Sequence, residues 1–113
     1  MSISFDSIGQ QCVTASADTT LAAGAVCKFS DNSVVSACAD GDDIHGFVEN
    51  IRGKNATVTV RGFVTAAYSG TAPTVGWCSL AGAASNKVKV LSGAKEYLVV
   101  HVNTAKNTVT FLL

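Results

Sequence analysis

Apolar and polar residues alternate with a period of two in several short segments of the chain. Residues 57–61, 87–90 and 108–111 all show this alternation. A period of two places the apolar side chains on one face of a β-strand. These segments therefore predict half-buried strands of an antiparallel sheet.

Clusters of Gly, Asn, Asp, Ser and Pro separate these segments at short intervals, as in proteins built from many short strands. Val, Thr and Ile supply 30 of the 113 residues, whereas Glu, Gln, Lys, Arg, Leu and Met supply 19, which is a strand-forming composition. Strands are predicted near residues 25–30, 34–39, 44–51, 56–68, 74–80, 87–91, 96–102 and 108–113. The pattern predicts an all-β fold, a small antiparallel β-barrel or sandwich of about eight short strands.

The first twenty residues differ from the rest in being rich in Ser, Gln, Thr and Asp, with isolated apolar positions. We interpret residues 1–20 as an extended N-terminal arm or a first edge strand, and residues 21–113 as a single all-β domain. The segments 54–59 and 106–110 look alike, but their internal spacing differs by one residue. We interpret the likeness as similar turn-then-strand chemistry and not as an internal repeat.

The charge balance argues against several classes of partner. Eight Lys and Arg offset eight Asp and Glu, so the net charge is zero and no basic stripe marks a nucleic-acid surface. No apolar run approaches the ~20 residues that span a bilayer, so we expect no membrane insertion. The N-terminus lacks a basic region followed by an apolar stretch, which favours synthesis in the cytoplasm.

Motifs that carry catalysis or metal binding are missing from the sequence. His45 and His101 are the two histidines that could act as a general base, but no serine lies in a G-x-S-x-G elbow. No phosphate-binding glycine motif occurs either. Asp40, Asp42 and Asp43 are not followed by the further ligands of a calcium loop, so we interpret them as a solvated turn. We therefore predict no catalytic residues, no cofactor, no metal and no enzymatic activity.

The four cysteines, Cys12, Cys27, Cys38 and Cys78, form no C-x-x-C pair, which disfavours zinc. Without a secretion signal we expect reduced, buried thiols. A disulfide between Cys27 and Cys38 is the alternative if their two strands pair.

Three aromatic residues suggest an alternative function. Trp77 with Tyr68 or Tyr97 could form a stacking platform for a sugar, as in a small β-sandwich ligand-binding module. Core packing explains the same three residues without any ligand. The two interpretations differ in whether the rings are exposed.

A succession of glycine-marked strand starts runs through residues 22–80. It comprises AGAV at 23–26, VVSACA at 34–39, IHGFV at 44–48, ATVTVRGFV at 56–64 and APTVGW at 72–77. This order resembles the tailed-phage capsid decoration, or cement, proteins. The resemblance implies a compact all-β barrel or sandwich that binds the outside of an icosahedral head and braces its subunits without a cofactor.

The composition agrees with such a role. Only 14% of the residues are charged, and many side chains are short, so they lose little entropy when they are ordered against a large neighbour. Weak contacts between copies around a symmetry axis add to one another. We therefore expect a structural virion protein, made in the host cytoplasm and located on the capsid surface, whose partners are the major capsid protein and neighbouring copies of itself.

Overall fold

The computed structural model describes residues 10–18 and 21–113, which form ten strands and no helix. The first five strands are β1 (Gln11–Ala17), β2 (Val26–Asp31), β3 (Val34–Ala37), β4 (Gly46–Arg52) and β5 (Asn55–Arg61). The last five are β6 (Phe63–Ala67), β7 (Gly76–Ala83), β8 (Lys87–Val90), β9 (Glu96–Asn103) and β10 (Thr108–Leu112). The all-β prediction is confirmed. Nowhere in these two ranges does a helix occur that is long and apolar enough to cross a membrane.

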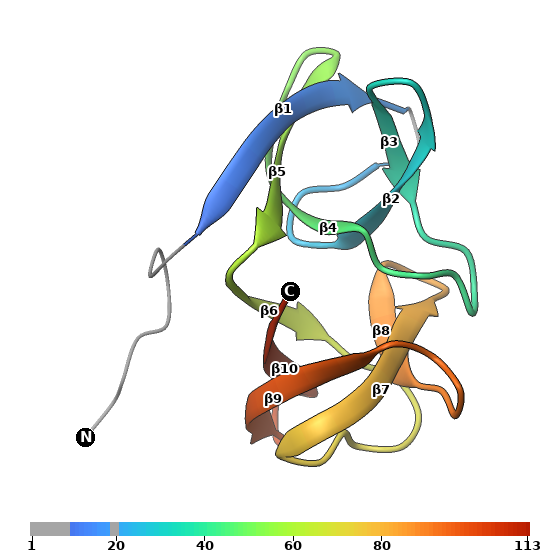
Figure 1. Cartoon of the computed structure of the whole chain (residues 1–113), viewed down its shortest axis with the longest axis vertical. Helices are drawn as coiled ribbons and strands as arrows, with labels where there is room; N and C mark the ends of the chain where they lie inside the picture. Colours follow the sequence, from blue (N-terminus) through green and yellow to red (C-terminus); the bar gives the residue numbers. More distant parts are fainter. Residues whose placement is uncertain (1–9, 19–20) are drawn as a thin grey trace.

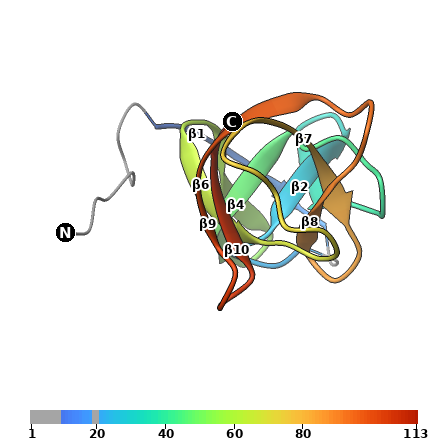
Figure 2. The same ribbon diagram turned by 90° about the horizontal axis from the view of Figure 1, so that it is seen from below.

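The strands form two curled sheets that lie one above the other in Figure 1. Strands β1–β5 close into a barrel in the order β1-β3-β2-β4-β5. Strands β6–β10 form a sheet in the order β6-β10-β9-β7-β8, which curls into a half-barrel and is seen from below in Figure 2. One isolated parallel bridge, from Tyr68 to Val88, connects the two edges of the half-barrel.

The barrel and the half-barrel have the same strand connectivity. In the barrel, the first strand pairs in parallel with the third and antiparallel with the fifth, the second pairs with the third and fourth, and the fourth pairs with the fifth. Strands β6–β10 repeat this scheme, with the Tyr68–Val88 bridge in place of the first parallel pairing. The similar segments 54–59 and 106–110 include the starts of β5 and β10, so their likeness coincides with equivalent places in the fold.

Two strand predictions differ from the structure. Residues 11–17 form β1, which is paired on both sides, so this part of the predicted 1–20 segment is a barrel strand and neither an arm nor an edge strand. Residues 1–9 and 19–20 lie outside the described residues. The predicted strand 56–68 divides into β5 and β6 at Gly62, whose φ of 132° favours glycine. A Cβ at Gly62 would also lie 3.0 Å from the Cα of Gln10.

Buried apolar residues form two clusters. The interior of the barrel holds Ala15, Cys27, Val35, Val48, Ala56 and Val58. The larger cluster fills the half-barrel and also includes Val26, Cys38, Ile44 and Phe47 from the barrel. The two units therefore pack through a shared core, and residues from the outside of the barrel are part of it.

The loop between β3 and β4, residues 38–45, attaches the barrel to the half-barrel. The Gly41 amide donates to the Gly82 carbonyl at 2.9 Å, and the Gly82 amide donates to the Asp42 carbonyl at 2.8 Å. The buried Tyr97 hydroxyl donates to the Ile44 carbonyl at 3.0 Å. These bonds fix the loop on β7 and β9 and so hold the two units together.

Candidate interaction surface

A row of apolar side chains crosses four strands on the outside of the half-barrel. Trp77 lies opposite Leu98, Leu98 opposite Leu112, and Leu112 opposite Phe63. Directly opposed residues of neighbouring strands share one face of a sheet. Their chain neighbours Cys78, Tyr97, Phe111 and Val64 are buried in the core, so the four residues of this outer row face outward.

The outer row forms a connected apolar strip and not a set of scattered residues. Trp77 is 68% exposed, and Phe63, Leu98 and Leu112 are partly buried. Val75, two positions before Trp77, is also exposed. Three inter-strand spacings give the strip a length of ~14 Å. A contiguous apolar strip of this kind marks an interaction surface more specifically than single exposed hydrophobic residues do.

Polar residues border the outer row on both sides. On one side Ser79 pairs with Glu96. On the other side the buried Thr110 lies between Thr65 and the exposed His101, its hydroxyl is 2.8 Å from that of Thr65, and the exposed Val75 interrupts this polar border next to Trp77. An apolar centre with a polar rim is the usual arrangement of a protein–protein interface.

The barrel carries an equivalent row in the same register. Val26 lies opposite Phe47, Phe47 opposite Thr59, and Thr59 opposite Cys12. Trp77, Leu98 and Phe63 follow Val26, Phe47 and Cys12 by 51 positions each, and Leu112 follows Thr59 by 53. We call these four residues the inner row.

The inner row is mostly covered. Val26 and Phe47 are 1% and 7% exposed and belong to the core cluster that fills the half-barrel. The buried Thr59 hydroxyl donates to Glu49 Oε1 at 2.7 Å and accepts a bond from Gln10 Nε2 at 2.6 Å. The same strand positions are therefore an internal interface in one unit and an outer surface in the other.

The three aromatic residues of the predicted sugar platform do not come together on the surface. Trp77 is exposed, but Tyr68 and Tyr97 are buried. The Tyr97 ring meets Phe111 edge-on with centroids 5.4 Å apart, and burial, with smaller contributions from Asp43 and Cys38, raises the pKa of its hydroxyl to about 12. Core packing accounts for both tyrosines, and a platform that needs either of them is contradicted.

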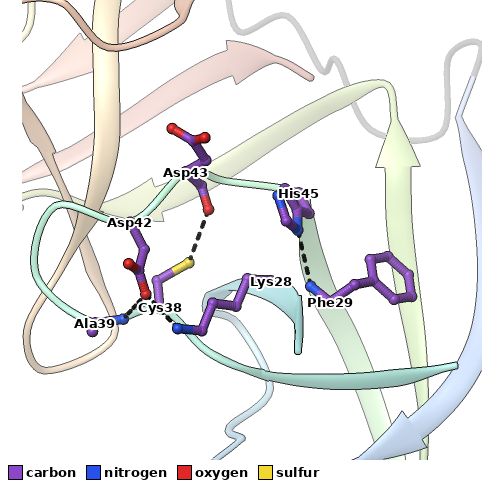
Figure 3. Close-up of polar contacts among 7 residues, drawn as sticks. All are labelled: Lys28, Phe29, Cys38, Ala39, Asp42, Asp43 and His45. Atoms are coloured by element: carbon purple, nitrogen blue, oxygen red, sulfur yellow. Dashed lines mark hydrogen bonds and ion pairs between the residues drawn. The ribbon is translucent and has the colours of Figure 1, made fainter. Parts of the chain in front are cut away.

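The acidic turn is engaged in ion pairs. Asp42 accepts a bond from Lys28 Nζ at 2.6 Å and one from the Ala39 amide at 2.9 Å (Figure 3). Lys28, followed by the Ala39 amide, lowers the pKa of the Asp42 carboxyl, and Asp42 raises the pKa of Lys28. Asp40 pairs with Lys89 of the half-barrel at 2.9 Å. Within residues 10–18 and 21–113, no cluster of three or more His, Cys, Asp or Glu side chains could hold a metal ion.

The two histidines lie in different units. His45 Nδ1 accepts a bond from the Phe29 amide at 2.9 Å, and its ring stacks beside that of Phe29 (Figure 3). His101 is exposed on β9, opposite Thr110. His45 is therefore held by a hydrogen bond within the barrel. His101 lies at the rim of the outer row.

All four cysteines are free thiols. Cys27, Cys38 and Cys78 are buried as predicted, whereas Cys12 is exposed, contrary to the expectation of buried thiols. Burial raises the pKa of Cys27 to about 12 and that of Cys38 to about 11. Strands β2 and β3 do pair, but the register places Ala37 opposite Cys27, so the alternative disulfide is not formed.

The sequence analysis missed the outer row, although the chain contains a signal for it. Apolar residues follow one another directly at Phe63–Val64, in residues 97–100 and in residues 111–113. Consecutive apolar residues in a strand make both of its faces apolar. The row could therefore have been inferred once the two faces of each strand were assigned.

Comparison with known proteins identifies no relative of this chain: no protein-family model, no curated protein and no solved structure matches it.

Proposed function

We propose that this protein is a non-enzymatic structural protein that binds the outer surface of a tailed-phage capsid and stabilises the shell. Its partners are the major capsid protein and neighbouring copies of itself. In this proposal it is made in the host cytoplasm, resides on the virion, and acts without cofactor, metal, nucleic acid or membrane. The observation that carries the proposal is the outer row, an apolar strip with polar neighbours on a hydrogen-bonded β-sheet.

The physical properties of the surface support lasting adhesion. Tryptophan is among the residues that contribute most to protein–protein binding, and Trp77 lies at one end of the strip. The zero net charge provides no long-range attraction, so contact must come from shape and apolar burial. The resemblance of residues 22–80 to capsid decoration proteins is the reason for proposing a capsid as the larger partner.

Undecorated heads of the cognate phage test the proposal. Purified protein is added at saturating concentration, and the heads are imaged and sedimented. We expect ordered surface density at symmetric positions and a higher resistance of the heads to heat. Heads that remain bare at saturation contradict the proposal.

A second candidate function is carbohydrate binding through Trp77 alone, which its 68% exposure favours. A single exposed indole ring can stack on the apolar face of a sugar. A glycan array tests this candidate: binding that disappears in Trp77→Ala, with an unchanged circular dichroism spectrum, supports it. An array without signal excludes it for the sugars tested.

A further inference from the structure

We infer that a polar hollow on the outside of the barrel binds an oxoanion group, a phosphate or a carboxylate, through Arg52. The hollow lies beside the turn between β4 and β5, at the end of the barrel that is far from the half-barrel (Figure 1). The inference goes beyond the proposed function and does not rest on it. The hollow has a volume of about 350 Å³, and the described residues that line it are Thr14, Asn50, Arg52, Asn55, Ala56 and Thr57.

Three neighbouring strands bring the polar side chains of the hollow to one face. Asn50 of β4 and Thr14 of β1 both lie opposite Thr57 of β5. Arg52 lies opposite Asn55, one step further along both strands on the same face. The residues between them on β4 and β5 pack in the barrel interior, so these five side chains face outward. The charged group therefore lies next to amides and hydroxyls.

A β-bulge in β4 places Asn50 and Arg52 on this face. Relative to β5, strand β4 has one extra residue, Glu49, between Val48 and Asn50. Without it, the alternation of the strand would turn Asn50 and Arg52 inward, on the side of the buried Val48. The half-barrel has the same irregularity between β9 and β10, so the two units can be compared position by position.

On the equivalent face of the half-barrel, two threonine hydroxyls satisfy each other. Thr65 lies opposite Thr110 there, and the two hydroxyls form a hydrogen bond at 2.8 Å. Thr14 and Thr57 are the corresponding pair of the barrel. Their hydroxyls form no hydrogen bond with any residue in the described part of the chain. They remain free to bind a ligand.

The same difference is found at the position of Arg52. Asn103 occupies the corresponding place in the half-barrel, and its side-chain oxygen accepts bonds from the amides of residues 105 and 106, each at 3.1 Å. Arg52 has no ion pair and no side-chain hydrogen bond within residues 10–18 and 21–113, and neither Asn50 nor Asn55 has one. The polar side chains of the hollow are therefore unengaged, whereas their bonded counterparts are used within the chain.

The charges of the hollow select an anion. Arg52 supplies a positive charge, and the described lining contains no acidic side chain. Glu49 lies in the adjacent bulge, but its Oε1 accepts bonds from Thr59 at 2.7 Å and from Gln10 at 2.8 Å, on the side of the inner row. The guanidinium presents a planar fork of N–H donors that matches two oxygens of a phosphate or a carboxylate.

The size of the hollow leaves room for more than the anion. A volume of about 350 Å³ is at the lower end of the range of small-ligand sites, roughly 300–1,000 Å³. Asparagine amides and threonine hydroxyls both donate and accept hydrogen bonds, so they can bind hydroxyl groups beside the anion. The matching ligand class is a small hydroxylated molecule that carries a phosphate or a carboxylate.

Nuclear magnetic resonance of the isotope-labelled full chain tests the inference. The probes are inorganic phosphate, glycerol phosphate and glycerate, with glycerol as the neutral control, and the ionic strength is held constant so that screening does not change. We expect the side-chain signals of Asn50, Asn55 and Arg52 to shift with one common midpoint. The Kd should be on the order of 1 mM, because an ion pair open to water contributes little. Binding of either the phosphates or glycerate supports the inference, and their order identifies the preferred anion.

Arg61 provides a matched control for Arg52. It is the one other arginine of the chain, it is also exposed, and a glycine follows each of the two. Arg52→Gln should weaken the binding of glycerol phosphate at least about tenfold, whereas Arg61→Gln should leave it unchanged. Arg52→Lys keeps the charge but removes the fork, so binding should weaken several-fold. Unchanged binding in Arg52→Lys would contradict the two-oxygen contact.

A second variant changes the charge of the hollow almost without changing its shape. Asn50→Asp adds a negative charge beside Arg52, so we expect the binding of every anionic probe to be lost. Both positions are exposed, and the spectrum of each variant reports directly whether the fold is retained. Anion binding that persists in folded Asn50→Asp and Arg52→Gln overturns the inference.

The wild-type titrations can also overturn the inference. No shift at Asn50, Asn55 and Arg52 up to about 20 mM of each anion would do so, and so would equal shifts at Arg61, which indicate unspecific attraction. Glycerol binding as tight as that of glycerol phosphate would show that the anion is not recognised. These titrations use no capsids, so heads that stay bare in the earlier experiment contradict the proposed function and leave this site unaffected.

Discussion

The barrel and the half-barrel share one strand connectivity but use the same positions in opposite ways. In the barrel the row that starts at Val26 is covered by the other unit, and in the half-barrel the row that starts at Trp77 is exposed. Packing within one unit therefore does not require an apolar outer row. The core of the half-barrel forms on the other face of this sheet, so the outer row is the surface that we propose for binding.

The two units also differ in the connection between their third and fourth strands. In the barrel this connection is the 38–45 loop, which bonds to β7 and β9. In the half-barrel it is the shorter segment 91–95, whose Lys95 carbonyl accepts a bond from the Leu80 amide of the same unit. The barrel therefore contributes the loop that joins the two units, and β7 and β9 of the half-barrel bind that loop.

The largest expected effect is a difference in stability between alanine substitutions at equivalent positions of the two rows. Phe47→Ala removes a buried ring from the shared core and should lower the free energy of unfolding by about 3–5 kcal/mol. Leu98→Ala, at the equivalent partly exposed position, should cost no more than about 1 kcal/mol. Urea denaturation at micromolar concentration measures both. Equal losses would show that the outer row is as important to the fold as the inner one.

A second prediction concerns the contact between the 38–45 loop and β7. A Cβ at Gly82 would clash with the Cβ of Cys38, so Gly82→Ala forces the loop away. We expect a loss of about 1–3 kcal/mol in the free energy of unfolding, as for overpacked cores. The double variant with Cys38→Gly removes the clashing atom and should recover part of the loss. If the double-mutant cycle shows no coupling between the two substitutions, the loop adjusts to the added methyl group without a cost in free energy.

The fold class was predictable from the sequence because alternation and turn residues are local signals. The alternation at 108–111 and the glycines that begin strands placed most strands within a few residues. For residues 11–17 the sequence left an arm and an edge strand open, because Gln11–Ala17 is largely exposed and a barrel strand with few buried residues has little alternation. The pairing of β1 on both sides was not predicted. The division at Gly62 was missed because it depends on the approach of Gln10, which is distant in sequence.

The candidate surface was harder to predict than the fold. Trp77 was identified as a residue of interest, but its row neighbours depend on the pairing register of β6, β9 and β10. Register is set by tertiary packing and not by the local pattern alone. For the same reason the sequence did not distinguish the exposed Trp77 from the buried Tyr97.

A third prediction compares the polar position of the inner row with its apolar counterpart. Thr59→Val removes a buried hydroxyl that bonds to Glu49 and Gln10, and should cost about 1–2 kcal/mol of unfolding free energy. Leu112→Thr, which makes the outer row resemble the inner row, should cost less than about 1 kcal/mol because Leu112 is partly exposed. Thermal and urea unfolding measure both. A larger loss from Leu112→Thr would reverse the order that the two rows imply.

The smallest expected effect is the pH dependence of the Lys28–Asp42 pair, which holds the 38–45 loop on the barrel side. Because the folded pKa of Asp42 is lowered from 3.8, its contribution is complete above that value and is lost as the pH falls through the folded pKa. The folded pKa of Lys28 is raised from 10.5, so its contribution is present below 10.5 and is lost as the pH rises through the folded pKa.

The urea midpoint of Asp42→Asn should therefore lie slightly below that of the wild type from about pH 5 to about pH 9, and the two should converge as the pH falls through the lowered pKa of Asp42. Glu96→Gln, which removes an exposed carboxylate from the half-barrel, serves as the control for the loss of one acidic group. Lys28→Met should show the same small difference, and should lose it both on acidification, when Asp42 is protonated, and at strongly alkaline pH, when Lys28 is deprotonated. The equivalent connection of the half-barrel, residues 91–95, contains no acidic residue. The loss of stability on acidification is therefore assigned to the 38–45 loop of the barrel. A difference that grew on acidification would mean that Asp42 destabilises the folded loop, in conflict with its two hydrogen bonds.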